Sequence, residues 1–264
     1  MRRVVITGVG LVSVLGVSRD QVANALYNGI SGIVAEPQRL EQGFRSPLTG
    51  RIEGFDGARH LNRKQRKSMP DFAIQAHAAT LDALEQAGLA PEALQSDRCG
   101  LVFGNDSTVQ SVVDQQAALL DAGCTSGMGS GHVFRCMNST ITMNLNVLLG
   151  NTGPSWTVSA ACASGAYAIG KAADQIRLGR LDRVVCGAAQ EINWQSVCSF
   201  DGLGAFSVRT PAVEASRPFD KSRDGLVPSG GAAALLLEDY DTARKRNAPI
   251  LAEVLGFGCS ADGE

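Results

Sequence analysis

Two hydrophobic periods alternate along this chain, one typical of buried strands and the other of amphipathic helices. Stretches with the helical period predict helices at 19–28, 71–88, 110–121 and 133–149, in the small-residue stretch after Cys162, and in the charged stretch after residue 237. Short apolar runs that end at glycine or at polar turns predict strands at 3–9, 99–104, 155–159, 182–187, 230–237 and 250–258. This alternation predicts an α/β layered fold built on a mixed, mostly parallel sheet.

The composition of the 264-residue chain is that of a folded protein, with 44% apolar residues available for a core. Its 24 basic and 26 acidic residues are spread along the sequence, so no overall field favours a nucleic acid partner. The apolar run that follows Met1, Arg2 and Arg3 is too short for a signal peptide, and no apolar run approaches the roughly 18 residues of a membrane span. We therefore expect a cytoplasmic protein with neither a nucleic acid nor a membrane partner.

The cysteines form an odd set of seven without the Cys-x-x-Cys spacing of zinc and redox sites, at positions 99, 124, 136, 162, 186, 198 and 259. We therefore expect no bound metal and no structural disulfide. Most of these thiols are expected to be small buried side chains, so a functional cysteine must stand out by its local setting.

Cys162 has such a setting, because a predicted strand ends shortly before it and a predicted helix begins at or just after it. Small neighbours let other backbone segments approach closely, and the unpaired N–H groups of a helix N-terminus favour the thiolate, the attacking form of a thiol. The backbone N–H of Cys162 can also help to hold an oxyanion at a thioester carbonyl. On spacing alone, a buried cysteine in a glycine and alanine helix that packs on the sheet is an equal alternative.

Several segments of the chain, in order, resemble the β-ketoacyl-acyl carrier protein synthases, most closely the synthase I/II type. The segment at 158–165, Val-Ser-Ala-Ala-Cys-Ala-Ser-Gly, is similar to the active-site motif of that family. The other segments are Arg-Val-Val-Ile-Thr-Gly-Val-Gly at 3–10, Gln-Ile-Arg-Leu-Gly at 175–179, Phe-Asp-Gly-Leu-Gly-Ala-Phe-Ser at 200–207 and Ser-Arg-Pro-Phe-Asp-Lys-Ser-Arg-Asp-Gly at 216–225. The resemblance implies a thiolase-like α/β/α fold of two similar halves, with residues 1–250 forming the N-terminal half and 251–264 beginning the second.

The same resemblance implies a 3-oxoacyl-acyl carrier protein synthase of fatty acid or polyketide-type chain elongation. Cys162 would accept an acyl group from acyl carrier protein, and the acyl-enzyme would condense with malonyl-carrier protein after decarboxylation. The family implies no resident cofactor, because its substrates are carried on the phosphopantetheine of the carrier protein. It also implies a homodimer, or a heterodimer with another ketosynthase-like chain.

A basic cluster falls where the family contacts its acidic carrier protein. It comprises Arg63, Lys64 and Lys67, within the densest run of positive charge in the chain. The alternative is a solvated helix start without a partner, which would carry the same charges.

The resemblance also points to an acyl-binding pocket, with Met137, Ala161 and Phe200 at the matching positions and Met137 reaching across the dimer interface. Met137 and Phe200 are equally compatible with an ordinary place in the core. One departure concerns 104–108, where the family has a more glycine-rich tract and this chain has Asp106, which is expected to alter the acyl tunnel.

The two catalytic histidines of the family have no counterpart in these residues, since His60, His77 and His132 lie in unrelated contexts. Two explanations remain open. The sequence is either part of a synthase of ordinary length or a half-length, non-catalytic subunit of the chain-length-factor type that pairs with an active synthase. The presence of Cys162 argues against the second explanation, because chain-length factors commonly lack that cysteine.

Overall fold

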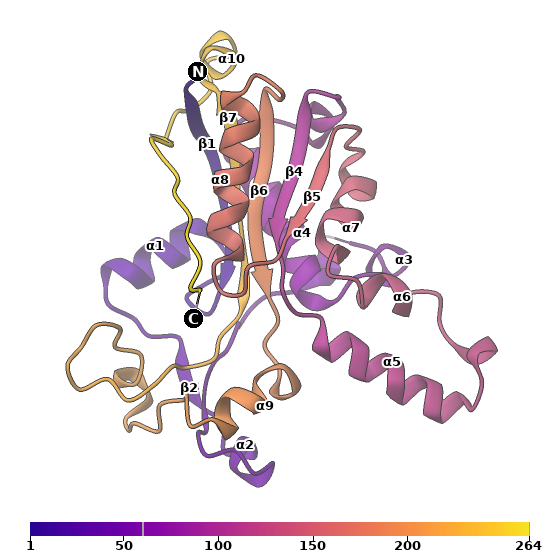
Figure 1. Ribbon diagram of the computed structural model, residues 1–264, viewed down its shortest axis with the longest axis vertical. Coiled ribbons are helices and arrows are strands. Elements are labelled where there is room, and N and C mark those ends of the chain that lie inside the picture. The colour runs from indigo at the N-terminus through magenta and orange to yellow at the C-terminus, as the bar shows by residue number, and fades with distance from the viewer. Residues whose placement is uncertain (60, 264) are drawn as a thin grey trace.

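The computed structural model describes residues 1–59 and 61–263, which form a central sheet with helices on both faces (Figure 1). The six-stranded sheet has the order β5-β4-β6-β7-β1-β8. Its strands are β1 (Val4–Ser13), β4 (Cys99–Gly104), β5 (Ser155–Val158), β6 (Arg183–Gln190), β7 (Gly231–Asp239) and β8 (Ala252–Glu253). A separate antiparallel pair consists of β2 (Ile33–Ala35) and β3 (Leu48–Gly50).

The helices connect these strands and differ widely in length. The α-helices are α1 (Arg19–Tyr27), α2 (Gln38–Glu41), α3 (Arg63–Arg66), α4 (Asp71–Gln86), α5 (Val109–Ala122), α6 (His132–Arg135), α7 (Thr140–Leu149), α8 (Ser164–Arg177), α9 (Trp194–Gly202) and α10 (Tyr240–Lys245). Short 3-10 turns occur at η1 (Gly57–Arg59), η2 (Pro91–Leu94), η3 (Thr125–Gly127) and η4 (Ala212–Glu214). Among the described residues, no helix is both long enough and apolar enough to cross a membrane.

The sheet is mixed, which confirms the predicted α/β layered fold. Strand β4 pairs in parallel with both β5 and β6, whereas β7 pairs antiparallel with both β6 and β1. Strands β1, β4, β5 and β6 therefore run in one direction, with β7 and β8 opposed to them. The carboxyl ends of the four codirectional strands meet at one edge of the sheet.

Two apolar clusters cover the two faces of the sheet. On one face α4 and α7 pack on alternate strand residues such as Leu101 and Phe103, and on the other α8 packs on Val102 and its neighbours. This period-2 alternation is what a sheet buried on both sides requires. The contact of β1 with α4 is very close, because a Cβ on Gly8 would lie 1.9 Å from the carbonyl oxygen of Ala83.

Most predicted elements are present, but the helix expected at 133–149 is interrupted. Helix α6 ends at Arg135 and α7 begins at Thr140. Between them, the carbonyl of Cys136 accepts a hydrogen bond from Thr108 Oγ1 at 3.0 Å, and that of Asn138 accepts one from Asn105 Nδ2 at 2.8 Å. These tertiary hydrogen bonds replace helical ones, so the backbone turns where the apolar period continues.

The strand expected at 250–258 is also much shorter, because only Ala252–Glu253 is a strand. The chain then runs along α8 (Figure 1). The Phe257 ring lies edge-on to the Tyr167 ring, with centroids 5.7 Å apart, and Tyr167 Oη donates to the carbonyl of Ser260 at 3.2 Å. Packing of this aromatic residue on α8 therefore takes the place of further strand pairing.

Candidate functional site

Cys162 lies in a tight turn between β5 and α8. Ala161 adopts a left-handed conformation with φ of 47°, which is uncommon for a residue with a Cβ. Ser164 Oγ stabilises the turn, since it accepts from the backbone N–H of Ala160 at 2.8 Å and donates to the carbonyl of Ala161 at 2.6 Å. Ser164 is buried whereas Cys162 is exposed, so the turn presents the sulfur to solvent at the start of the helix.

Small residues allow the first turn of α8 to lie directly on the sheet. A Cβ on Gly104, at the end of β4, would lie 2.5 Å from the carbonyl carbon of Ser164 and 2.8 Å from the backbone nitrogen of Gly165. A Cβ on Gly165 would in turn lie 3.1 Å from Cβ of Ala188 on β6. The position of Cys162 is therefore fixed by backbone packing on the ends of β4 and β6.

An open cleft of about 330 Å³ contains Cys162 at the carboxyl edge of the sheet. Its walls are the ends of β1, β4 and β6, the start of β7 and the first turn of α8. Crevices at this edge of an α/β sheet are the usual place for ligands. The predicted acyl-binding residue Ala161 lines this cleft, as does Asp106, the departure noted in the sequence.

The other cysteines have different surroundings. Cys186 is fully buried in β6, and this burial raises the pKa of its thiol far above the ordinary value. Burial also raises the pKa of the Cys99 thiol. Cys124 and Cys198 are exposed but do not line the cleft. Cys162 thus combines exposure with a place in a cavity, as a nucleophile requires.

The other two predicted acyl-binding residues do not line the Cys162 cleft. Met137 is 41% exposed in the connector between α6 and α7. Phe200 is 49% exposed on α9, where its ring stacks on that of Phe206 with centroids 6.3 Å apart. Their acyl-binding role stays a prediction, because the chain alone does not bring them to the sulfur.

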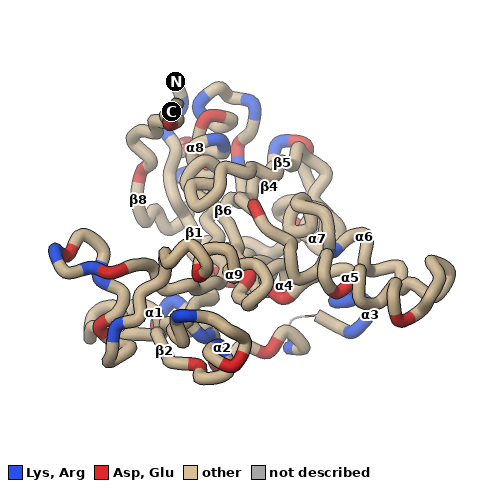
Figure 2. Tube along the Cα trace, turned by 60° about the horizontal axis from the view of Figure 1, so that its bottom comes forward, with Lys and Arg blue, Asp and Glu red and all other residues tan. Residues whose placement is uncertain are grey.

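The basic cluster Arg63, Lys64 and Lys67 lies on α3 and its C-terminal cap, and all three side chains are exposed. Figure 2 shows α3, with basic residues in blue, on the side of the molecule where α5 and α6 lie. A capping box between Asn62 and Gln65 starts the helix. The cluster is thus solvent-facing, as both sequence interpretations require.

Neither described histidine belongs to the cleft. His77 is buried in α4, His132 begins α6, and His60 lies outside the described residues. Sequence reasoning missed two polar residues, one in the wall of the cleft and one in the larger cavity next to it. Asn105 is only 2% exposed and lines the cleft, and Glu191 accepts hydrogen bonds from Ser107 Oγ and from the N–H of Val109 at the start of α5. The available signal was a polar residue directly after each of two buried strands.

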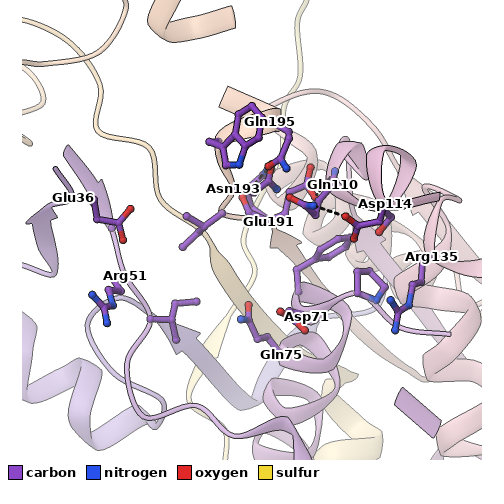
Figure 3. A pocket seen from close by; sticks show the side chains of 18 of the residues that line it. Glu36, Arg51, Asp71, Gln75, Gln110, Asp114, Arg135, Glu191, Asn193 and Gln195 are labelled. Atoms are coloured by element: carbon purple, nitrogen blue, oxygen red, sulfur yellow. Dashed lines mark hydrogen bonds between the residues drawn. The ribbon is translucent and has the colours of Figure 1, made fainter. Parts of the chain in front are cut away.

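A second, larger and more polar cavity of about 780 Å³ lies between the β2–β3 pair and the starts of α4, α5 and α9. Figure 3 shows Glu36 and Arg51 on one side and Gln110 and Asp114 on the other, with Gln110 Nε2 donating to Asp114 Oδ1 at 2.7 Å. None of the predicted site residues lines this cavity, which adjoins the Cys162 cleft at Gln190, a residue that lines both.

Comparison with known proteins gives a consistent result. The profile of the family described as "Beta-ketoacyl synthase, N-terminal domain" matches residues 1–243. The 3-oxoacyl-acyl-carrier-protein synthase 1 of Haemophilus influenzae is 36% identical over 268 residues, covering 100% of this chain and 65% of the relative.

Solved structures agree with the sequence comparison. The crystal structure of a β-ketoacyl synthase from Burkholderia phymatum STM815 superposes with a TM-score of 0.91 at 34% identity, covering 100% of this chain and 65% of that one. The ishigamide ketosynthase/chain length factor gives a TM-score of 0.84 at 30% identity, covering 97% and 62%. The chain thus spans just under two thirds of the length of these proteins. Together with the profile match over nearly all of its length, these likenesses show that the chain belongs to the β-ketoacyl synthase family and carries its N-terminal domain.

Proposed function

We propose that this chain provides the acyl-accepting half of a 3-oxoacyl-acyl carrier protein synthase, with Cys162 as the nucleophile. The observation that carries the proposal is the exposed sulfur at the start of α8, within a cleft at the carboxyl edge of the sheet. The names of its relatives, which are 3-oxoacyl-acyl-carrier-protein synthases, support the same reaction class.

In the first step the Cys162 thiolate attacks the carbonyl carbon of an acyl thioester on the phosphopantetheine of a carrier protein. The new C–S bond forms, the bond to the phosphopantetheine sulfur breaks, and that thiol leaves with a proton. The N-terminal end of the 14-residue helix α8 stabilises negative charge at the attacking sulfur and at the developing oxyanion. This covalent step divides one difficult reaction into two easier ones.

In the second step a malonyl thioester loses CO₂, and the resulting carbanion attacks the carbonyl carbon of the acyl-Cys162 thioester. A carbon–carbon bond forms, and the cysteine thiolate is released. The enolate oxygen that develops on the malonyl thioester needs hydrogen-bond donors, and no histidine lines the cleft among the described residues. We propose that residues beyond this chain supply these donors.

The carrier protein is proposed to dock on Arg63, Lys64 and Lys67, because an exposed basic surface suits an acidic partner. Reversal of all three charges is expected to weaken binding by about 10-fold or more at low salt, and added salt should weaken binding to the unaltered protein. Equilibrium binding at two ionic strengths tests this. Unchanged affinity after the reversal would exclude the cluster as the docking site.

We also propose that the protein pairs with a second copy or with a related ketosynthase-like chain. Helix α5 extends away from the sheet (Figure 1) and exposes Val112, Val113 and Leu120. An exposed apolar helix face of this kind favours association. Sedimentation of the intact protein over a range of concentrations gives the oligomeric state, and a stable monomer would contradict the proposal.

The test of the nucleophile uses the intact protein and an acyl-carrier protein with a labelled acyl group. Label is expected on Cys162 after peptide mapping, while the exposed thiols of Cys124 and Cys198 serve as internal controls. Substitution Cys162→Ala should abolish labelling. Label on another cysteine, with Cys162 unmodified, would refute the assignment.

The second candidate is a non-catalytic subunit of the chain-length-factor type that shapes the acyl tunnel of an active partner. The absence of histidine from the described cleft and the likeness to the ishigamide ketosynthase/chain length factor favour it. Assay of Cys162→Ala in the intact complex separates the two candidates. Full elongation activity would support the subunit role, and loss of activity would support catalysis.

A further inference from the structure

The proposed docking helix α3 has little packing of its own. It consists of four residues, none of them buried, and a helix this short is not stable by itself. The chain on either side is anchored by Leu61 and Met69, which are 4% and 2% exposed. The position of the basic side chains therefore depends on what contacts the C-terminal end of α3.

Arg135, the last residue of α6, makes those contacts. Its Nε donates to the carbonyl of Lys67 at 3.0 Å, and its Nη2 donates to that of Arg66 at 3.5 Å. A helix end leaves carbonyls without a helical partner, and a cation there is favourable. The Arg66 carbonyl also accepts from the N–H of Met69 at 3.1 Å, so Arg135 adds a second donor there. The backbone of Gly131 also packs on this end, because a Cβ at that position would lie 2.2 Å from the Lys67 carbonyl oxygen.

The residues that follow Arg135 are tied to the Cys162 cleft. Thr108 Oγ1 donates to the carbonyl of Cys136 at 3.0 Å, and Asn105 Nδ2 donates to that of Asn138 at 2.8 Å. Asn105 itself lines the cleft and directly follows β4. Hydrogen bonds at both ends, joined by the backbone of the connector 136–139, thus link the basic helix to the wall of the cleft.

We propose that Arg135 is a positioning residue that fixes the basic helix α3 relative to the Cys162 cleft. The proposal rests on the function proposed above, in which a carrier protein docks on α3 and delivers a thioester on an arm of fixed length. Because that length is fixed, a displacement of the docking helix misplaces the thioester carbon at the sulfur. Near-attack geometry is sensitive to displacements of about 1 Å.

Arg135→Lys is the informative variant, because it keeps the positive charge but loses the planar fork that reaches two carbonyls. If Arg135 acted only as one more docking charge, the lysine would replace it. If Arg135 positions α3, the lysine variant should bind carrier protein normally and transfer the acyl group slowly. Arg19→Lys makes the same exchange at a half-buried site at the start of α1 and is the matched control.

The experiment measures Cys162 acylation in the intact protein with two donors, an acyl-carrier protein and the corresponding acyl-coenzyme A. For Arg135→Lys we expect kcat with the carrier-bound donor to fall about 10-fold, with KM within twofold and the rate with acyl-coenzyme A unchanged. Equal losses with both donors, a rise in KM alone, or no change would each overturn the proposal.

Hydrogen exchange provides a readout that does not depend on the proposed function. In Arg135→Lys, backbone amides of 63–69 and of the connector 136–139 should exchange several-fold faster than in Arg19→Lys, while those of α8 should not change. Unchanged exchange in 63–69 would overturn the inference even if Cys162 is acylated. Faster exchange in a protein whose Cys162 is never acylated would leave the anchoring intact and refute the proposed function.

Discussion

The close backbone contact between the end of β4 and the first turn of α8 gives a specific prediction, which concerns Gly104→Ala. The added Cβ would lie 2.5 Å from the Ser164 carbonyl carbon and 2.7 Å from its oxygen, whereas ordinary contact begins at 3.4 Å. Neither partner is the flexible end of a side chain. The end of β4 and the first turn of α8 must therefore separate by roughly 1 Å.

Two effects of different size should follow from this separation. Overpacking of a well-packed interface typically costs about 1–3 kcal/mol in the free energy of unfolding, which urea titration would measure. The turn that carries Cys162 moves with α8, and misplacement of a reacting group by 1 Å costs about 10²-fold in rate. We therefore expect a stable, folded variant whose acylation of Cys162 is slowed about 100-fold.

Gly202→Ala is the control for this variant. A Cβ there meets nothing within 4 Å, and the residue is the last of α9, so alanine should be neutral or slightly stabilising. If Gly104→Ala matched both this control and the unaltered protein in stability and acylation rate, the close packing of α8 on β4 would not position the nucleophile.

Three further predictions concern other hydrogen bonds and ion pairs. The Arg98 guanidinium lowers the pKa of Asp182 from 3.8 to about 2. Asp182→Asn should therefore lower the free energy of unfolding by about 1 kcal/mol at neutral pH, a value reduced for solvent screening because a third of the Asp182 side chain is exposed. That stability is complete above pH 3.8 and is lost as the pH falls towards 2, so unfolding curves of the two proteins should converge there. Ser164→Ala removes the two side-chain hydrogen bonds of the turn and should lower the free energy of unfolding by about 1–3 kcal/mol and slow acylation, whereas unchanged acylation would show that the turn holds without them. Glu238→Gln leaves Arg183 and Arg246 facing a neutral amide in a fully buried site, so the free energy of unfolding from urea titration should fall by about 3–5 kcal/mol. A fall of less than about 1 kcal/mol would contradict a native ion pair there.

The architecture was predictable from the sequence where local signals and tertiary packing agree. Helix α4 was expected to end at Gly88; it ends at Gln86, and Gly88 follows its C-cap with the left-handed φ of 67° that favours glycine after a helix. The prediction of one helix at 133–149 was wrong, because the side chains that interrupt it, Asn105 and Thr108, come from another part of the sequence. The prediction that a strand reaches residue 258 was also wrong because of a tertiary contact, since Phe257 packs on α8.

The same contrast between local sequence signals and contacts with distant segments applies to the candidate site. The turn at Cys162 was predictable, because a strand end, a run of small residues and a helix start lie next to one another in the sequence. The contact of Arg135 with the end of α3 could not be predicted. Its two acceptors are backbone carbonyls, which every residue type has, so the residue types in the sequence do not indicate them. Positions that act through backbone atoms of another segment thus become visible only in three dimensions.

The strand order explains why a nucleophile at this turn is held so firmly. The chain passes from β5 through α8 to β6, and β4 lies between these two strands. Helix α8 must therefore cross β4, and its first turn lies against the end of that strand at Gly104. The same crossing brings the positive end of the helix to the carboxyl edge of the sheet, where the cleft opens. A residue at this turn is thus exposed to a ligand on one side, while on the other side the backbone of β4 holds the turn in place. An attacking thiolate needs both accessibility and a fixed position.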